Sequence, residues 1–284
     1  MKKSFTQLES PVLAGVVKEE TAKSVIAEIK NNSLSGANAF DVHISCLGKE
    51  ECTAEKLKQI ADSTCKPIMA LHYNQAYDLG PMNESDEDRM RQLLVAAKAG
   101  FACVDMQGYT FEPRRDTKAT LKSEWITEHM SFVSACPNEV TLNPETIEKQ
   151  IEFMNEVHST GAEVLLSTHT ECFLSCQQVM DLLDFLAQRK PDILKLVTAG
   201  CDTDEQVHEY CKTLLTIKNR YPNIKITYFC NGKKTVQTRA LGVLLGAHIT
   251  FCVNRYDALS TVSQLPLKET AEMYGLFRKI INEG

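Results

Sequence analysis

The chain has 284 residues, of which 43% are hydrophobic and 24% are charged, and its formal net charge is −6. These proportions are normal for a soluble globular protein, and the negative charge argues against a protein that binds the phosphate backbone of nucleic acids. No apolar run approaches the roughly 20 residues of a membrane span. The basic start MKK is followed by an apolar run that polar residues and Pro11 interrupt, so we expect no signal peptide and no membrane partner.

The eleven cysteines lie mostly inside apolar strand or helix patterns, as Cys103 and Cys230 do. Their odd number and the absence of a CxxC pair favour reduced thiols in a reducing compartment. A free cysteine also packs well as a small core residue. We therefore expect a cytoplasmic protein.

Short apolar runs alternate with longer helical patterns along the whole chain, and a predicted helix follows each predicted strand. The alternation predicts parallel strands joined by helical crossovers, and eight such units fit a (β/α)8 TIM barrel of one domain over residues 1–284. The alternative is a doubly wound open sheet, whose first strand usually ends in a Gly-rich turn that VLAGVVKEE lacks. The predicted strands cover residues 11–17, 40–45, 67–73, 103–108, 163–169, 193–198, 224–229 and 248–253.

One segment, at about 110–145, breaks this alternation between the fourth strand and its helix, and it contains the only tryptophan, Trp125. A loop of this length is usually functional or disordered. We interpret it as an insertion on the C-terminal face of the barrel that could cover a pocket or contact a partner. A family-specific surface decoration is an equally good interpretation.

The active sites of (β/α)8 barrels lie at the C-terminal ends of the strands, so polar residues at those ends are the candidates for chemistry. The alternation of side chains along a strand places those of the second strand on one side. The candidates are Asp41, His43, Ser45, His72, Tyr73, Asp105, Gln107, Ser167, His169, Lys195, Asn231, Arg239, Asn254, Ser260 and Gln264.

Lys195 is the most informative candidate because it interrupts the otherwise apolar strand ILKLVT. A charged amine in a dry strand is costly unless it is paired, deprotonated or used in chemistry. In a purely structural interpretation, its stem packs sideways and its ammonium reaches solvent or a carboxylate. In the functional interpretation, it points into the mouth of the barrel, where desolvation leaves a neutral amine that can attack a carbonyl and form an imine.

His169 ends the preceding predicted strand, EVLLSTH. Neighbouring strands lie about 5 Å apart, so its imidazole could reach a substrate bound to Lys195. A histidine near neutrality suits proton transfer in both directions. We therefore predict that His169 and Lys195 act together.

At these residues the chain resembles the type I 3-dehydroquinate dehydratases, which are Schiff-base (β/α)8 enzymes of the shikimate pathway. EVLLSTHT is similar to the family's segment that ends in the catalytic histidine, and ILKLVT to its strand with the imine-forming lysine. TVQTRALGVLLGAHITF resembles the segment with the arginine that binds the substrate carboxylate, here Arg239. DALSTVSQLPL resembles the final loop, whose serine and glutamine close over substrate, here Ser260 and Gln264.

The resemblance implies that Lys195 forms an imine with the ketone of a small carboxylated keto substrate. His169 then removes the proton next to the imine carbon and helps the β-hydroxyl to leave as water, and hydrolysis frees the enone. The expected substrate is 3-dehydroquinate or a closely related cyclic 3-hydroxy ketone carboxylate. The resemblance implies no metal and no organic cofactor, and it suggests a homodimer.

Several positions depart from the family pattern and predict a rewritten substrate-binding wall. Asp41 and His43 stand where the second strand carries Glu-x-Arg, and Tyr73 where the third strand ends in arginine. Gln107 replaces an acidic residue of the fourth strand. The glutamate that orients the catalytic histidine would fall at Tyr77, with Asp78 one residue on.

Three alternatives stay open from the sequence. A Schiff-base aldolase or a dehydratase of another keto-acid would share Lys195 and His169. A zinc protein could use His169, Cys172 and Cys176, although no fourth ligand is evident. A non-catalytic homologue could keep the barrel without its activity.

Overall fold

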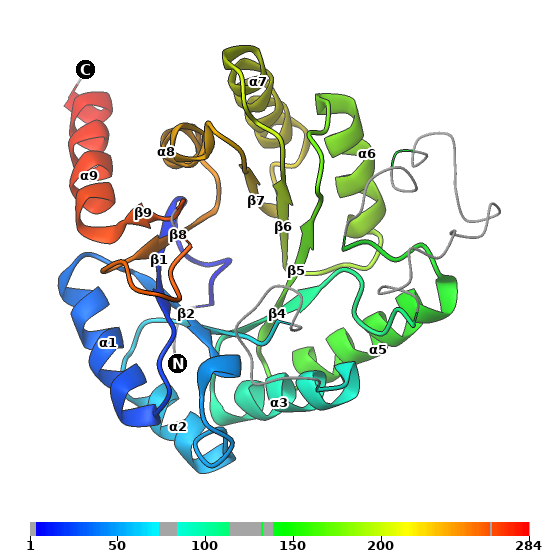
Figure 1. Ribbon diagram of the computed structural model, residues 1–284, viewed down its shortest axis with the longest axis vertical. Coiled ribbons are helices and arrows are strands. Elements are labelled where there is room, and N and C mark those ends of the chain that lie inside the picture. The colour runs from blue at the N-terminus through cyan, green and yellow to red at the C-terminus, as the bar shows by residue number, and fades with distance from the viewer. Residues whose placement is uncertain (1–3, 74–83, 114–131, 133–138, 262, 284) are drawn as a thin grey trace.

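Nine parallel strands form one continuous sheet in the computed structural model of the chain, in the order β7-β6-β5-β4-β3-β2-β1-β8-β9 (Figure 1). The structure describes residues 4–73, 84–113, 132, 139–261 and 263–283. The strands are β1 (Val12–Val17), β2 (Ala39–His43), β3 (Ile68–Leu71), β4 (Cys103–Gln107), β5 (Glu163–His169), β6 (Ile193–Thr198), β7 (Lys225–Cys230), β8 (Ile249–Val253) and β9 (Leu265–Pro266).

The helices lie outside the strands and follow them in chain order, which confirms the predicted (β/α)8 barrel (Figure 1). Sequential neighbours pair from β1 to β7, and β8 pairs with β1, an order that a doubly wound sheet would not give. The described helices are α1 (Ala22–Leu34), the 3-10 turn η1 (Ile44–Cys46), α2 (Ala54–Asp62), α3 (Asp86–Ala99), α5 (Pro144–Ser159), α6 (Cys176–Ala187), α7 (Asp204–Arg220), α8 (Thr235–Leu245) and α9 (Leu267–Glu283).

The seam between β7 and β8 is joined at the N-terminal ends of the two strands. The backbone N–H of His248 donates to the carbonyl of Ile226 at 3.0 Å, and the N–H of Ile249 donates to the hydroxyl of Thr227 at 2.8 Å. The two-residue strand β9 extends the sheet beside β8. It was not predicted, because two residues are too short for a periodic pattern.

Local signals in the sequence fix the helix ends. Thr21, Ser175 and Thr203 each begin a helix with a capping box. The cap side chain accepts the backbone N–H of the residue three positions on, and the side chain of that residue accepts the backbone N–H of the cap. Gly100 and Gly246 end α3 and α8 at φ 104° and 94°, a left-handed conformation that favours glycine.

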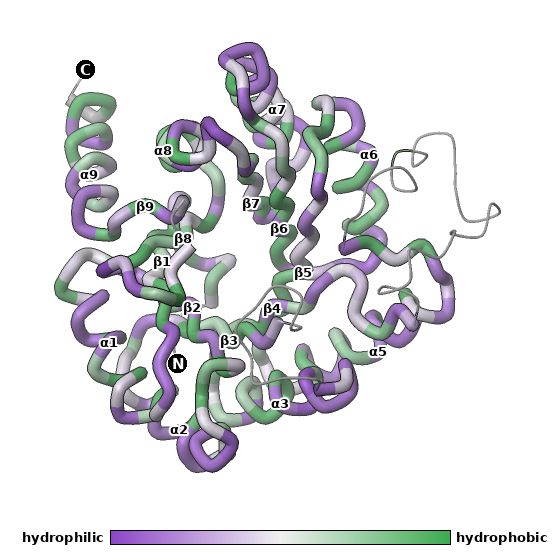
Figure 2. Tube along the Cα trace, in the orientation of Figure 1, coloured by the Kyte–Doolittle hydropathy of each residue, from purple (hydrophilic) through white to green (hydrophobic). Residues whose placement is uncertain are grey.

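The core has two layers, one inside the barrel and one between the strands and the helices. Phe5, Leu165, Ile193 and Phe251 belong to the inner layer, whereas residues such as Leu183 pack in the outer one. Figure 2 shows hydrophobic strands surrounded by helices with polar outer faces. Every residue of β6 is buried, as predicted for a strand covered on both sides. The helices in the described part of the chain are all too short or too polar to cross a membrane.

The described strands form one continuous sheet, and the single domain over residues 1–284 stays a prediction. Most of the predicted insertion, with Trp125, lies outside the described residues. Val140 and Leu142, near its end, are buried and belong to the core. The expectation of reduced cysteines holds for the buried thiols of Cys103 and Cys230, but Cys172 is disulfide-bonded, so the expectation was wrong there.

The N-terminal segment closes the end of the barrel at which the strands begin. The backbone N–H of Phe5 donates to Glu163 Oε2 at 2.7 Å, and its carbonyl accepts from His248 Nε2 at 3.1 Å. The other ring nitrogen of His248 accepts from the Ser10 hydroxyl at 2.7 Å. Burial, with a smaller contribution from Lys225, lowers the pKa of His248 to about 4, so this imidazole is neutral in the folded protein.

This burial predicts that the protein loses stability as the pH falls from 6.5 to 4. An unfolded histidine, with a pKa near 6.5, binds its proton first, so acid favours the unfolded chain. The shift corresponds to a loss of about 3 kcal/mol. Urea unfolding at several pH values should show this loss in the unaltered protein. His248→Gln, which cannot titrate, should be less stable at pH 7.5 but lose less in acid. Equal losses in both proteins would contradict the assignment.

Candidate active site

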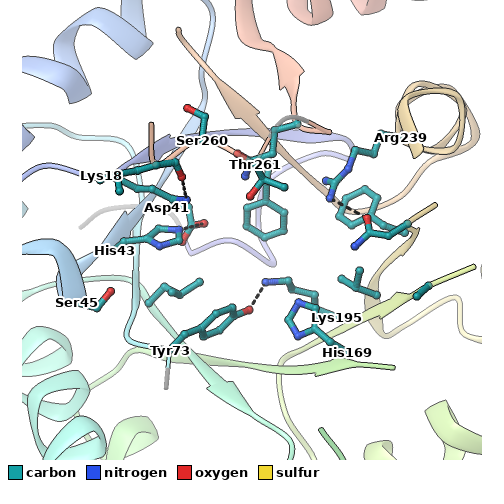
Figure 3. A pocket seen from close by; sticks show the side chains of 18 of the residues that line it. Lys18, Asp41, His43, Ser45, Tyr73, His169, Lys195, Arg239, Ser260 and Thr261 are labelled. Carbon is teal, nitrogen blue, oxygen red and sulfur yellow. Dashed lines mark hydrogen bonds and ion pairs between the residues drawn. The ribbon is translucent and has the colours of Figure 1, made fainter. Parts of the chain in front are cut away.

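A cavity of about 760 Å³ opens at the C-terminal ends of the strands, the end where the barrel fold predicts it (Figure 3). Its volume lies in the range of small-molecule sites. It brings together ten of the fifteen candidates, and the five that do not line it are His72, Asp105, Gln107, Ser167 and Asn254. The described residues that line it include Lys18, Asp41, His43, Ser45, Tyr73, His169, Glu171, Lys195, Phe229, Asn231, Arg239, Phe251, Ser260, Thr261 and Gln264.

Lys195 projects from β6 into this cavity, as the functional interpretation predicts, and its side chain is only 8% exposed. Its Nζ donates to the hydroxyl of Tyr73 at 2.6 Å and to Asp105 Oδ2 at 3.0 Å. Asp105, on β4, is fully buried. The amine of Lys195 is therefore paired with a buried carboxylate as well as shielded from solvent. The amine must pass a proton to a neighbour before it can attack a carbonyl.

Tyr73 follows β3 and contacts both predicted catalytic residues. Its hydroxyl contacts Lys195 and lies 3.2 Å from Asp105 Oδ2, and its ring meets the His169 ring edge-on at 5.6 Å between centroids. Burial, together with the charges of Asp105 and Glu139, raises the pKa of Tyr73 well above its ordinary value. The side chain is therefore a neutral phenol.

His169, at the end of β5, is held by a carboxylate that sequence reasoning missed. Its Nδ1 lies 2.5 Å from Glu139 Oε2, and its backbone N–H donates to the same oxygen at 3.2 Å. The side chain of Glu139 has no exposed surface, and the backbone N–H of Glu139 donates to the carbonyl of His169 at 2.8 Å. Assigning the proton to Nδ1 satisfies the carboxylate and makes Nε2 the basic nitrogen of this ring.

The resemblance placed the histidine-orienting glutamate near Tyr77 and Asp78, which lie outside the described residues. Glu139 occupies this role from the far end of the segment after β4. One signal could have revealed it, because Glu139 opens the run EVTL directly before the helix cap Asn143. An acidic residue joined to a short β-prone run is a candidate for burial rather than for a surface loop.

Gln107 lies behind the site instead of lining it. Its side-chain amide donates to Glu139 Oε1 at 2.7 Å, and its oxygen accepts from Arg89 at 3.2 Å. Arg89, buried on α3, also pairs with Asp86 at 2.6 Å and donates to the carbonyl of His72 at 2.6 Å. A buried polar chain thus runs from α3 to His169. Gln107 positions Glu139 in this structure, in place of the substrate contact that was predicted.

Arg239 stands on α8 at the edge of the cavity next to β7. Its guanidinium lies 4.8 Å from the centroid of the Phe229 ring, and one Nη donates to the side chain of Asn231 at 3.4 Å. Burial lowers its pKa. No described residue accepts from its Nε. A buried guanidinium with unused donors is suited to bind a carboxylate.

The predicted closing residues lie in the loop after β8. The Ser260 hydroxyl donates to Asp257 Oδ1 at 2.9 Å, within the loop itself. The carbonyl of Gln264 accepts from Tyr256 at 2.6 Å, and that of Leu259 accepts from Lys18 at 2.5 Å. These contacts hold the loop beside the cavity mouth.

Asp41 and His43, both on β2, form the wall of the cavity opposite Arg239, as Figure 3 shows. Asp41 Oδ2 lies 3.5 Å from His43 Nε2, and both side chains are largely buried. The zinc alternative loses its support, because Cys172 is disulfide-bonded and His169 Nδ1 is held by Glu139. No group of three or more metal-ligating side chains was found among the described residues.

Comparison with known proteins agrees with this geometry. The sequence model of a family described as type I 3-dehydroquinase matches residues 109–281. The fold is similar to a type I 3-dehydroquinate dehydratase from Clostridium difficile with covalently modified comenic acid, with a TM-score of 0.70, 14% identity, and 99% of this chain and 100% of that chain covered. It is also similar to a 3-dehydroquinate dehydratase from Geobacillus kaustophilus, with a TM-score of 0.73, 12% identity, and coverage of 98% and 97%. No curated protein matches the chain in sequence.

The position of Glu139 predicts a large cost for its removal. Glu139→Ala leaves three buried donors without their acceptor, the ring and backbone N–H of His169 and the amide of Gln107. We expect a loss of at least about 3 kcal/mol in the free energy of unfolding, and about 1 kcal/mol for Glu139→Gln, which keeps an acceptor. Urea unfolding measures both. The exposed Glu148 gives the control, since Glu148→Ala should stay within about 0.5 kcal/mol of the unaltered protein.

Proposed function

The chain belongs to the type I 3-dehydroquinase family, a family of carbon–oxygen lyases, and from this premise we propose that it is a Schiff-base dehydratase. Its substrate is 3-dehydroquinate or a closely related cyclic 3-hydroxy ketone carboxylate, and its products are 3-dehydroshikimate, or the corresponding enone, and water. One observation carries the proposal: the amine of Lys195, the imidazole of His169 and the guanidinium of Arg239 line one cavity.

The reaction begins when the amine of Lys195 attacks the ketone carbon of the substrate. A carbinolamine forms, loses water and becomes a protonated imine. The imine nitrogen withdraws electrons, which makes the neighbouring C–H more acidic. The burial of Lys195 in a cavity lined by Phe251 and Tyr73 limits competing water and supports this step.

His169 then removes the proton from the carbon next to the imine. Nε2 accepts this proton, while the carboxylate of Glu139 holds Nδ1 and stabilises the imidazolium that forms. The electron pair of the C–H bond moves into the enamine. When the enamine electrons move back toward the β-carbon, they expel the β-hydroxyl, which takes the proton from His169 and leaves as water. Hydrolysis of the conjugated imine restores the Lys195 amine and releases the enone.

Arg239 binds the substrate carboxylate in this proposal, with Asn231 beside it. Ser260 and Gln264 contact substrate from the loop after β8, and Asp41, His43 and Tyr73 contact its hydroxyl groups. The buried free thiols, such as that of Cys103, support a cytoplasmic location, and the homodimer stays a prediction from the resemblance.

A related Schiff-base enzyme acting on another keto-acid is the second candidate. The specific observation that favours it is the wall of Asp41, His43 and Tyr73, in place of the arginines that the family resemblance implies. This wall offers a carboxylate, an imidazole and a phenol to substrate hydroxyls. It would select a different pattern of hydroxyl groups while leaving the imine chemistry at Lys195 unchanged.

Reduction of the imine gives the decisive experiment. Borohydride added together with 3-dehydroquinate should produce a stable adduct that mass spectrometry maps to Lys195. Lys195→Met should give no adduct, whereas Lys212→Met, which alters an exposed lysine on α7, should give as much as the unaltered protein. An adduct only with another keto-acid would favour the second candidate, and no adduct with any of these would refute imine chemistry.

Arg239 should contribute mainly to substrate binding. Arg239→Met removes a charged hydrogen-bonding partner worth about 1.5–3 kcal/mol, so we expect KM to rise about 10- to 150-fold with a smaller change in kcat. Steady-state kinetics with 3-dehydroquinate measures this. Arg220→Met, on the outer face of α7, is the matched control and should leave KM unchanged. A fall in kcat without a rise in KM would assign Arg239 another role.

A further inference from the structure

We propose that Tyr73 and Asp105 form a proton relay for Lys195, in which Tyr73 is the general acid and base that acts on the carbinolamine oxygen and Asp105 holds the proton in transit. This inference rests on the proposed imine chemistry and assigns the residues that make and break the imine. It leaves the C–H proton to His169. The two proton transfers of the reaction thereby belong to different groups.

The geometry places three reactive atoms in one triangle. Nζ of Lys195 lies 2.6 Å from the Tyr73 hydroxyl and 3.0 Å from Asp105 Oδ2, and the hydroxyl lies 3.2 Å from the same carboxylate oxygen. The residues come from β6, the end of β3 and β4, so three parallel strands fix the triangle. Figure 3 shows Tyr73 and Lys195 joined by the first of these contacts within the cavity.

The buried ion pair makes such a relay necessary. An ammonium cannot attack a carbonyl, so Lys195 must first give up a proton, and Asp105 is the carboxylate in contact with it. Asp105 has no exposed surface, so bulk water does not reach it directly to receive that proton. The phenol of Tyr73 contacts both groups and can pass a proton between the carboxylate and an oxygen bonded next to Nζ.

His169 is placed for the other transfer. Its Nδ1 is held by Glu139, so it exchanges protons with the substrate through Nε2. Its ring lies 5.6 Å from the Tyr73 ring, centroid to centroid, at an interplanar angle of 84°, so the imidazole and the phenol are two separate groups within one cavity. A single imidazole serving both sites would need to change its protonation state between the steps. Two separate groups avoid this requirement.

The transfers balance in protons and electrons. The ammonium of Lys195 gives one proton to Asp105, and the amine attacks the ketone carbon while the C=O electron pair moves to oxygen. Tyr73 donates its proton to that oxygen and takes one from the nitrogen, which gives the neutral carbinolamine. Tyr73 then protonates the hydroxyl, which leaves as water, and recovers a proton from Asp105. One ammonium and one ketone have become a protonated imine and water, and both side chains have returned to their starting forms.

The phenol suits this role because it stays protonated. Burial and the nearby carboxylates of Asp105 and Glu139 raise the pKa of Tyr73, so the resting group is a neutral donor. Its proton is transferred only as another arrives from Asp105 or from the nitrogen. No separate phenolate has to persist in the cavity.

Loss of ¹⁸O from the ketone of labelled 3-dehydroquinate measures imine formation and hydrolysis without requiring dehydration. We would follow it by mass spectrometry in a His169→Gln background, where the C–H step is blocked, after subtracting the exchange without enzyme. The parent His169→Gln protein should still exchange the label. Adding Tyr73→Phe should slow exchange at least 100-fold, in the range of general acid–base effects. Adding Tyr221→Phe, which alters a tyrosine at the end of α7 whose hydroxyl contacts Met180 on α6, should change nothing.

Asp105→Asn gives a second variant that preserves shape and removes the proton store, and it should also slow exchange at least 100-fold. Circular dichroism and the binding of substrate, followed by protection against thermal unfolding, check that each variant is folded and binds. Exchange at the parent rate in folded Tyr73→Phe would overturn the relay while leaving the imine intact. If the unaltered protein exchanges the label and His169→Gln does not, the relay would be overturned in favour of proton transfer by the imidazole. Absence of exchange and of a borohydride adduct in the unaltered enzyme would overturn the proposed function itself.

Discussion

The buried ion pair between Lys195 and Asp105 is the constraint on which the rest of the site depends. Two buried charges are stable only when they pair with each other and form further hydrogen bonds. Removing one partner of such a pair lowers the free energy of unfolding by about 3–5 kcal/mol. The barrel satisfies this by placing the lysine on β6 and the aspartate on β4, with Tyr73 between them. The same arrangement holds the amine at the point where substrate enters.

A second polar chain holds the imidazole with similar rigidity. It begins with the ion pair of Asp86 and Arg89 on α3, passes through Gln107 and Glu139, and ends at His169. The first four members are buried and hydrogen-bonded to their neighbours, and Glu139 holds Nδ1 of His169, so the ring has little freedom to turn. Because Glu139 follows the long segment after β4, the position of the histidine depends on how that segment returns to the core.

The fold could be predicted from the sequence because its signals are local. Buried strands alternate with helices, and side-chain caps or glycines mark several helix ends, and each of these signals depends on a few neighbouring residues. Lys195 and His169 could be found for the same reason, since each stands at a position that the strand pattern makes unusual. The tertiary partners could not be found in this way. Glu139 is 30 residues from His169 in the chain, and Asp105 is 90 from Lys195, so only the closed barrel reveals either contact.

The charges around the cavity determine how a carboxylated substrate can be oriented. Arg239 and Asn231 stand next to β7, whereas the carboxylate of Asp41 stands across the cavity on β2. A substrate carboxylate is attracted by the guanidinium and repelled by Asp41, and both effects are strong because the walls are of low dielectric. In the proposed function, a ring held in this orientation would present its ketone to Lys195 and its hydroxyl groups to Asp41 and His43. In the proposed function, the residues of the second and third strands would therefore change the recognition of hydroxyl groups, while Arg239 would preserve the direction in which the carboxylate enters.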